Sequence, residues 1–293
     1  MNTLISIIGP TAVGKTSLSV ELATKYKTEI ISSDSRQMYQ FMNIGTAKPT
    51  MEEQKDIPHH FIDTLTPDQS YNAGEFEREA EVLIIDLFQR YSTLIVVGGS
   101  TLYNNALWYG FNEMPQIDPL IREGLNKEMQ SLGLESLLDE LYTNDPETYE
   151  RIDRQNPVRG QPISTFRTGP TPKERPYKTI KIGLGDERET LYKRINQRVI
   201  DMLDQGLIEE VQGLLDRGYS PTLPALQSIG YQEVISYLQG KYDLDEAIRL
   251  IKRNSRRYAK RQLTYFRRYE DIHWFKPDEF PSLHSRLEEE IRS

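Results

Sequence analysis

The sequence predicts an α/β fold: a parallel sheet carrying a phosphate-binding loop (P-loop), helices on both faces of the sheet, and a small inserted helical subdomain. Two observations predict the parallel sheet. A glycine-rich motif stands between an apolar strand and a helix, and the strands are continuously apolar, as is typical of parallel strands buried on both faces. The insertion is predicted from residues 113–177, where the character of the chain changes. Right-handed crossovers between the strands follow by default.

The elements of the core alternate along the chain. Residues 4–8, 29–32, 93–97 and 178–184 are short apolar runs, and each is predicted to be a strand. Residues 16–26 and 71–91 have helical spacing of apolar positions. From residue 187 to about residue 268 the pattern is helical again, with breaks near Gly206, 218–224 and Gly240.

The insertion separates two parts of one catalytic core, residues 1–112 and 178–293, the second of which ends in basic helices. Residues 120–141 have the spacing of amphipathic helices. A series of prolines then makes the exit irregular: Pro146, Pro157, Pro162, Pro170, Pro172 and Pro176. Residues 113–177 are therefore predicted to form a mostly helical subdomain.

Composition excludes several classes of protein. The 293 residues are 37% hydrophobic and 27% charged, which supplies a real core and argues against disorder. The absence of Cys excludes disulfides, thiolate metal sites and cysteine nucleophiles. No apolar run approaches the ~18 residues of a membrane span, and the N-terminus lacks a basic region and a cleavage site. A soluble cytoplasmic protein without a membrane partner is expected, and nothing requires more than a monomer.

The strongest motif is GPTAVGKT at residues 9–16, which matches G-x-x-x-x-G-K-[ST] in full. Its glycines let backbone N–H groups turn toward phosphate oxygens, and the following helix adds a favourable dipole. Lys15 is expected on the terminal phosphate and the Thr16 hydroxyl on Mg²⁺. The predicted diphosphate-binding residues are Gly9, Pro10, Thr11, Ala12, Val13, Gly14, Lys15 and Thr16.

The motif indicates a diphosphate rather than ATP in particular. Nucleotide-hydrolysing relatives hold Mg²⁺ with an Asp that ends an apolar strand, whereas the strand at 93–97 runs into Gly98, Gly99 and Ser100. An acid does follow the second strand, at Asp34. Because loops at strand carboxyl ends converge on the ligand crevice, Asp34 could serve as a general base or bind a water molecule of a magnesium ion. The alternative is an Asx-turn or a helix N-cap.

Two adjacent histidines, His59 and His60, do not predict a metal site. Adjacent side chains point apart on a helix or a strand, and no third histidine lies nearby in the sequence.

A basic stripe interrupts an acidic chain. Lys and Arg number 36 and Asp and Glu 44, a net charge of −8, yet residues 251–268 contain no acid. Their cations are Lys252, Arg253, Arg256, Arg257, Lys260, Arg261, Arg267 and Arg268. Such a stripe favours a polyanion, and the alternative is a solvated helix face.

Several further segments, taken in order with the phosphate loop, resemble the tRNA dimethylallyltransferase (isopentenyl-tRNA transferase) family. They are DSRQ at 34–37, IGTAKP at 44–49, PHH at 58–60, GGS at 98–100, RINQR at 194–198, QSIGY at 227–231 and KRQ at 260–262. The loop alone is generic. The other segments are specific to that family and cover most of the chain.

The resemblance implies transfer of a dimethylallyl group from dimethylallyl diphosphate to N6 of an adenosine beside the anticodon of tRNA, with Mg²⁺ as cofactor. It implies that Asp34 is the general base, that Arg198 contacts the diphosphate, and that Ser100 lies beside the substrates, where the family more often has Thr. The adenine has to leave its stack to react. The residues expected to contact the anticodon stem-loop are Asp34, Ser35, Arg36, Gln37, Ser100, Arg122, Val158, Arg159, Gln227, Gly230, Tyr231, Lys260, Arg261, Gln262 and Arg267.

The chain departs from the family after Arg159. There the family continues as a helix, whereas this sequence passes at once to Gly160 and Gln161. Roughly a dozen residues, about three helical turns, are absent. Either the chain carries a deletion or residues are missing from the printed sequence, and the matches on both sides favour the second. A real deletion would weaken tRNA binding and leave the diphosphate site intact.

Two other functions stay open on the sequence. A nucleotide or small-molecule kinase would use the same phosphate loop, but the missing acid at the strand end and the basic stripe count against it. A non-catalytic RNA-binding relative would explain the gap after Arg159, but Lys15, Thr16 and Asp34 are all present.

Overall fold

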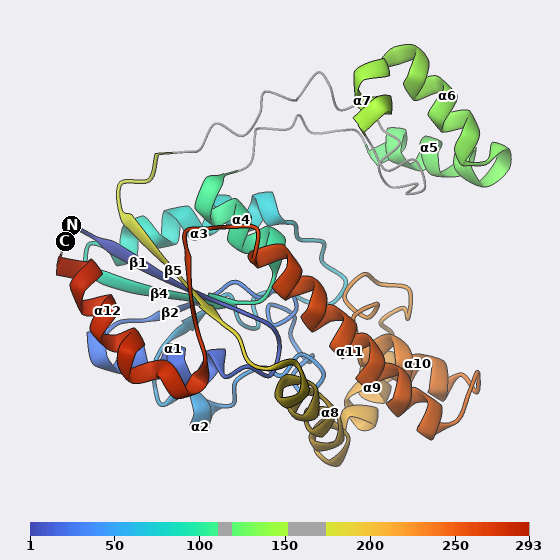
Figure 1. Cartoon of the computed structure of the whole chain (residues 1–293). Coiled ribbons are helices and arrows are strands. Elements are labelled where there is room, and N and C mark those ends of the chain that lie inside the picture. The colour runs from blue at the N-terminus through green and yellow to red at the C-terminus, as the bar shows by residue number, and fades with distance from the viewer. Residues whose placement is uncertain (111–118, 152–173, 293) are drawn as a thin grey trace. The chain divides into compact units, whose positions relative to one another are not determined.

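The computed structural model describes residues 1–110, 119–151 and 174–292 (Figure 1). The chain divides into two compact units, one made of Met1–Trp108 with Glu174–Ser293 and the other of Tyr109–Lys173. Among the described residues, no helix is long and apolar enough to cross a membrane.

The larger unit is built on a six-stranded sheet of order β3-β2-β4-β1-β5-β6, in which every pairing is parallel. Its strands are β1 (Thr3–Ile8), β2 (Ile30–Ser32), β3 (His59–His60), β4 (Thr93–Gly98), β5 (Lys178–Leu184) and β6 (Ile272–Phe275). The predicted fold class and all four predicted strands are confirmed. The two edge strands were not predicted, because a two-residue strand and a four-residue strand carry too little pattern to be distinguished from loops.

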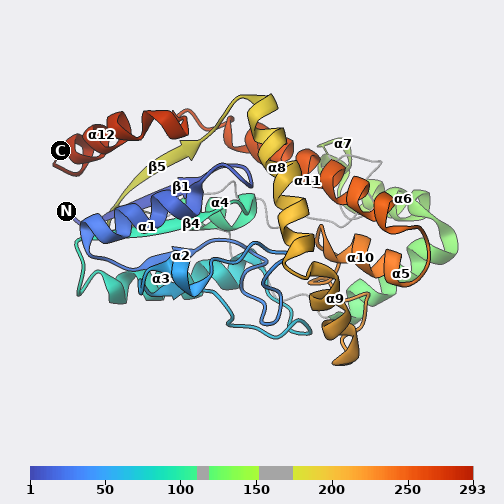
Figure 2. The same cartoon turned by 90° about the horizontal axis from the view of Figure 1, so that it is seen from below.

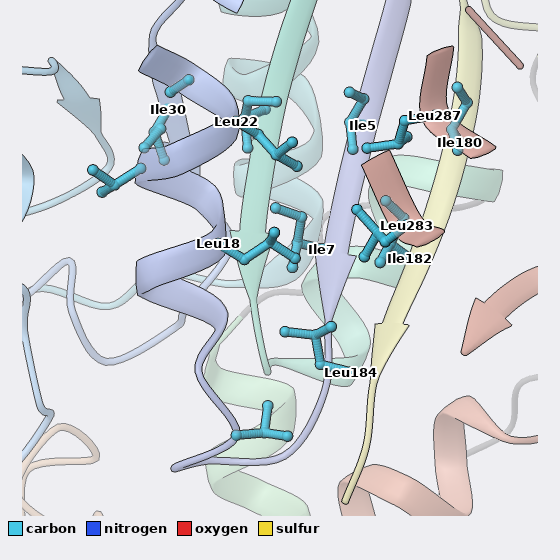
Figure 3. Close-up of a cluster of buried hydrophobic side chains, with 14 of the residues drawn as sticks. Ile5, Ile7, Leu18, Leu22, Ile30, Ile180, Ile182, Leu184, Leu283 and Leu287 are labelled. Carbon is cyan, nitrogen blue, oxygen red and sulfur yellow. The ribbon is translucent and has the colours of Figure 1, made fainter. Parts of the chain in front are cut away.

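Alternation along the strands supplies one apolar layer to each face of the sheet. Ile5 and Ile7 face α1 (Lys15–Tyr26) and α12 (Phe280–Arg292), and Leu18, Leu22, Leu283 and Leu287 complete that cluster (Figure 3). On the other face, Leu4 and Val96 pack against α3 (Ala73–Leu87) and α4 (Thr101–Tyr109). Helices therefore cover both faces, as predicted, and α12 is an additional helix that the sequence pattern did not reveal.

A helical cluster lies beyond the carboxyl ends of the strands (Figures 1 and 2). It consists of α8 (Arg188–Asp204), α9 (Leu207–Asp216), α10 (Tyr231–Leu238) and α11 (Leu244–Phe266). These helices pack around Tyr231, which is fully buried, and they enclose Tyr39 and Met42 from the segment after β2. The breaks predicted near Gly206, 218–224 and Gly240 separate these helices. The helical cluster faces the loops that follow the strands, and these loops and helices together line the cavity described below.

The remaining elements are short or belong to the smaller unit. α2 (Met51–Gln54) and a 3₁₀ turn (Pro277–Glu279) lie in the larger unit. The smaller unit contains α5 (Pro119–Leu132), α6 (Leu134–Asn144) and α7 (Pro146–Arg151). Leu137 and Leu141 of α6 are buried within it. Helical spacing predicted from residues 120–141 is thus found as two consecutive helices.

Candidate active site

A cavity of about 480 Å³ lies where the sheet meets the helical cluster. Its lining comes mainly from the phosphate loop, the segment after β2, helix α8, the residues before α10 and helix α11. The lining includes Thr11, Lys15, Thr16, Asp34, Ser35, Arg36, Gln37, Arg198, Gln227, Gly230, Tyr258, Arg261 and Gln262. Residues predicted for the diphosphate and residues predicted for the RNA therefore share one cavity.

The phosphate loop presents the free N-terminal end of α1 to this cavity. Gly14 has a φ of 100° and precedes the helix without a side-chain cap. The first N–H groups of α1 have no partner within the helix, so they are available to an anion. Gly9 has a φ of 152°, and a Cβ there would lie 2.5 Å from the Leu184 carbonyl oxygen. The loop can pass this close to β5 only as glycine.

Lys15 opens the helix and carries the first positive charge of the site. Its Nζ donates a hydrogen bond to the Pro10 carbonyl oxygen at 2.7 Å. Burial lowers the pKa of Lys15 to about 8; the Asp34 carboxylate opposes this shift and the Arg198 guanidinium adds to it. Lysine ammonium, carboxylate and guanidinium are therefore within electrostatic reach of one another.

Arg198 brings a second positive charge from α8. Its Nη1 donates to Thr11 Oγ1 of the phosphate loop at 3.2 Å, across 187 positions of sequence. Burial lowers the pKa of Arg198, which shows that its charge is poorly hydrated. An anion in the cavity would restore that lost solvation.

Asp34 is held in a defined orientation by its own backbone. Its Oδ1 accepts a hydrogen bond from the Arg36 N–H at 2.9 Å, so the Asx-turn weighed as an alternative is present. The same residue lines the cavity and acts electrostatically on Lys15 and Tyr258. The turn therefore orients the carboxylate and is compatible with a chemical role for it.

Ser100 links the loop after β4 to the segment after β2. Its hydroxyl is buried, accepts from the Ser35 N–H at 2.9 Å and donates to Ser35 Oγ at 3.1 Å. Gly98, two residues before it, leaves no space for a side chain, because a Cβ there would lie 2.5 Å from the Ser33 carbonyl oxygen. Ser100 thus supports the loop that carries Asp34.

The donors in the cavity fit a magnesium ion that is shared with a phosphate ligand. The Thr16 hydroxyl, the Ser32 hydroxyl and the Asp34 carboxylate all line it. In the part of the chain that the structure describes, no three His, Asp or Glu side chains gather into a metal site. Mg²⁺ commonly takes one or two protein oxygens and completes its shell with water and substrate phosphates. The Thr16 hydroxyl offers one such oxygen.

Three of the residues predicted for RNA interact with neighbouring loops. Arg36 Nη1 donates to the Pro224 carbonyl oxygen at 3.1 Å, and Gln37 Nε2 donates to the Ala47 carbonyl oxygen at 3.1 Å. Gln227 is exposed, and its Nε2 donates to the Pro221 carbonyl oxygen at 2.7 Å. These contacts hold polar side chains at the cavity without burying them completely.

Gly230 and Tyr231 fit a direct RNA contact less well. Tyr231 is fully buried, and its hydroxyl donates to Glu210 Oε1 at 2.5 Å. Glu210 also accepts from the Ile44 N–H at 2.8 Å, so it ties the segment at 44–49 to α9. The Gly230 N–H is likewise buried and donates to Glu233 at 2.7 Å. Gly230 lines the cavity, whereas Tyr231 belongs to the buried core of the helical cluster.

Helix α11 separates its predicted RNA contacts into two groups. Lys260, Arg261 and, just past the helix, Arg267 are exposed, as a phosphate contact requires. Gln262 is only 2% exposed and points to the phosphate loop. Arg122 lies in α5, but its side chain is outside the described residues, as are Val158, Arg159 and the position of the sequence gap.

Tyr258 also lines the cavity, although it was not among the residues predicted from the sequence. Burial and, next in size, the Asp34 carboxylate raise the pKa of Tyr258 to about 12, so the phenol keeps its proton. A signal was available: Ile251, Ser255, Tyr258 and Gln262 follow helical spacing, and all four line the cavity.

The histidine pair also has a partner that is distant in the sequence. His60 Nε2 lies 2.6 Å from Oε2 of Glu29, the residue just before β2.

Comparison with known proteins gives consistent matches. The family model for IPP transferase matches residues 37–269. The tRNA dimethylallyltransferase of Cytophaga hutchinsonii is 45% identical over 99% of this chain and 97% of its own length. A crystal structure of the full-length tRNA isopentenylpyrophosphate transferase of Bacillus halodurans has a TM-score of 0.78 and 40% identity, and covers 100% of this chain and 97% of that one. The structure of a eukaryotic dimethylallyltransferase acting on tRNA has a TM-score of 0.77 and 26% identity, and the match covers 94% of this chain and 74% of that one.

Proposed function

This chain belongs to the IPP transferase family, and we propose that it transfers a dimethylallyl group from dimethylallyl diphosphate to N6 of an adenosine beside the anticodon of tRNA. The observation that carries the proposal is the shared cavity, which a diphosphate cradle and the Asp34 carboxylate line together. A transferase needs both, because the leaving diphosphate and the attacking nucleophile have to flank one carbon atom. The kinase hypothesis has no comparable use for the basic stripe of helix α11.

On the donor side, the loop binds the group that leaves. The N–H groups at the start of α1 point to the diphosphate, and Lys15 and Arg198 neutralise the negative charge that develops as the C–O bond breaks. The Thr16 hydroxyl would hold Mg²⁺, which when bound supplies further charge neutralisation on the phosphate oxygens. Because both cations are poorly hydrated in the free site, they lose little water when the anion binds.

On the acceptor side, Asp34 removes a proton. The exocyclic amine of adenine is a weak nucleophile, since its lone pair is delocalised into the ring. A carboxylate that accepts the N6 proton as the N–C bond forms leaves a neutral secondary amine as product. The Asx-turn with Arg36 keeps one carboxylate oxygen on the backbone and orients the other. Ser35, Arg36, Gln37 and Gln227 are the proposed contacts to the extruded base and its neighbours.

The test of the reaction is nucleoside mass spectrometry on unmodified tRNA incubated with the 293-residue protein, dimethylallyl diphosphate and Mg²⁺. The expected result is a dimethylallyl-adenosine that is absent when Lys15→Met replaces the wild type. The same mixture with ATP in place of the prenyl donor should give no product. If only ATP is consumed, the kinase hypothesis holds instead. If nothing is consumed, the assay is repeated with the dozen residues restored after Arg159.

Exposed cations at the end of α11 are proposed to contact the phosphates of the tRNA. Lys260→Ala combined with Arg261→Ala should weaken tRNA binding. The slope of log Kd against log salt concentration should fall by about 2, because the loss of two phosphate contacts reduces the number of counterions released on binding. Filter binding over a series of salt concentrations measures the slope. Dimethylallyl diphosphate binding should not change. An unaltered slope would identify α11 as a merely solvated helix face.

A further inference from the structure

We infer that Gln262 is a positioning residue that joins the donor and acceptor halves of the site, rather than an RNA contact. The inference rests on the proposed function. Gln262 lies in α11, directly after the exposed Lys260 and Arg261, yet it is only 2% exposed. A side chain that is buried to this degree cannot reach an RNA backbone from its present position.

The oxygen and the nitrogen of the Gln262 side-chain amide each form a hydrogen bond with the backbone of a separate loop. Its Oε1 accepts a hydrogen bond from the Thr11 N–H of the phosphate loop at 3.2 Å. Its Nε2 donates to the Gly99 carbonyl oxygen, in the loop after β4, at 2.8 Å. One side chain thus spans the gap between the loop for the diphosphate and the loop that leads to Ser100.

The loop at Gly99 is shaped to receive this amide. A Cβ added at Gly99 would lie 2.3 Å from Gln262 Nε2, so any side chain there would displace the glutamine. Ser100, the next residue, holds the backbone of Ser35 and so the segment that carries Asp34. The chain of contacts therefore runs from Thr11 through Gln262 and Ser100 to the carboxylate.

Thr11 is held from two sides, because Arg198 donates to its hydroxyl while Gln262 accepts from its N–H. The reaction requires correct spacing between the Asp34 carboxylate and the dimethylallyl carbon that is bonded to the diphosphate. Small misplacements of reacting groups lower the rate of transfer reactions strongly. Loss of the Gln262 bridge should therefore reduce transfer and donor binding and spare tRNA affinity. A direct RNA contact would produce the opposite pattern.

Gln262→Met tests the bridge by keeping the volume and removing both hydrogen bonds. We expect kcat/KM for dimethylallyl diphosphate to fall by about 10- to 100-fold, while the Kd for tRNA stays within about twofold. The affinity for inorganic diphosphate, measured by calorimetry without turnover, should fall as well. Thr264→Val, an exposed change on the same helix, is the matched control and should leave all three unchanged. A raised Kd for tRNA with unchanged donor kinetics would overturn the inference.

Gln262→Glu adds a readout that a general loss of stability would not produce. The ionised carboxylate of this variant can accept from the Thr11 N–H but cannot donate to the Gly99 carbonyl oxygen, whereas the protonated acid can do both. The ratio of variant to wild-type transfer rates should therefore rise as the pH falls from 8 to 5. A ratio independent of pH would overturn the inference. If the wild type transfers no prenyl group, the proposed function fails, and diphosphate affinity still tests the bridge.

Discussion

Asp34→Asn is expected to reduce the rate of dimethylallyl transfer by about 10²- to 10⁴-fold, the range for loss of a general base. The amide can still accept the Arg36 N–H, so the Asx-turn seen in the structure is preserved. It cannot take the N6 proton. Single-turnover rates with saturating substrates isolate this step, since neither donor nor tRNA binding limits them.

The companion change Asp34→Ala removes the turn as well as the base. The two variants should have similar rates if proton removal dominates, and both should bind tRNA nearly as well as the wild type. Activity retained in the Asn variant and lost in the Ala variant would instead assign Asp34 an orienting role. Equal losses in rate and in tRNA affinity would remove Asp34 from the chemistry altogether.

Lys15→Met is expected to lower kcat/KM for dimethylallyl diphosphate by about 10²- to 10³-fold, the cost of removing a preorganised charge from a developing anion. Lys15 is half-buried in the lining of the cavity, so solvent compensates only weakly for the lost charge. Lys15→Arg, which keeps the charge on a larger group, should retain part of the activity. tRNA affinity should be unaffected in both variants.

The pH profile separates charge from shape at the same position. Burial lowers the pKa of Lys15 to about 8, so the ammonium is charged below that pH and neutral above it. The wild-type kcat/KM for the donor should therefore decline as the pH rises through about 8, because this parameter reports the free enzyme. The Met variant should lack this decline, and the Arg variant should also remain flat because arginine keeps its charge. A wild-type profile without the decline would contradict the proposed role of the Lys15 charge.

The fold was accessible from the sequence where local pattern is strong. Continuous apolar runs at β1, β4 and β5 lie between helices with clear spacing, and those strands were predicted within two residues of their bounds. The edge strand β6 and helix α12 were missed. Among the described strands, β6 pairs only with β5, and α12 is held against α1 by Lys25–Glu288 and by buried leucines, which are contacts between distant parts of the chain.

The candidate site divides in the same way. Sequence identified the phosphate loop, Asp34 and the exposed cations of α11, since each lies in a short motif whose chemistry is readable without neighbours. It could not distinguish Gln262 from Lys260 and Arg261, nor reveal that Tyr231 is buried while Tyr258 lines the cavity. These assignments depend on which face of a helix is covered.

The sequence by itself determined the phosphate loop, the parallel strands and the family, because glycine conformations, apolar runs and short motifs act over a few consecutive residues. Only the tertiary structure brought Arg198 to Thr11, Glu29 to His60 and Gln262 to Gly99. These partners are separated by 187, 31 and 163 positions. Contacts over such separations arise from the packing of whole helices and strands against one another, which no local pattern of residues specifies.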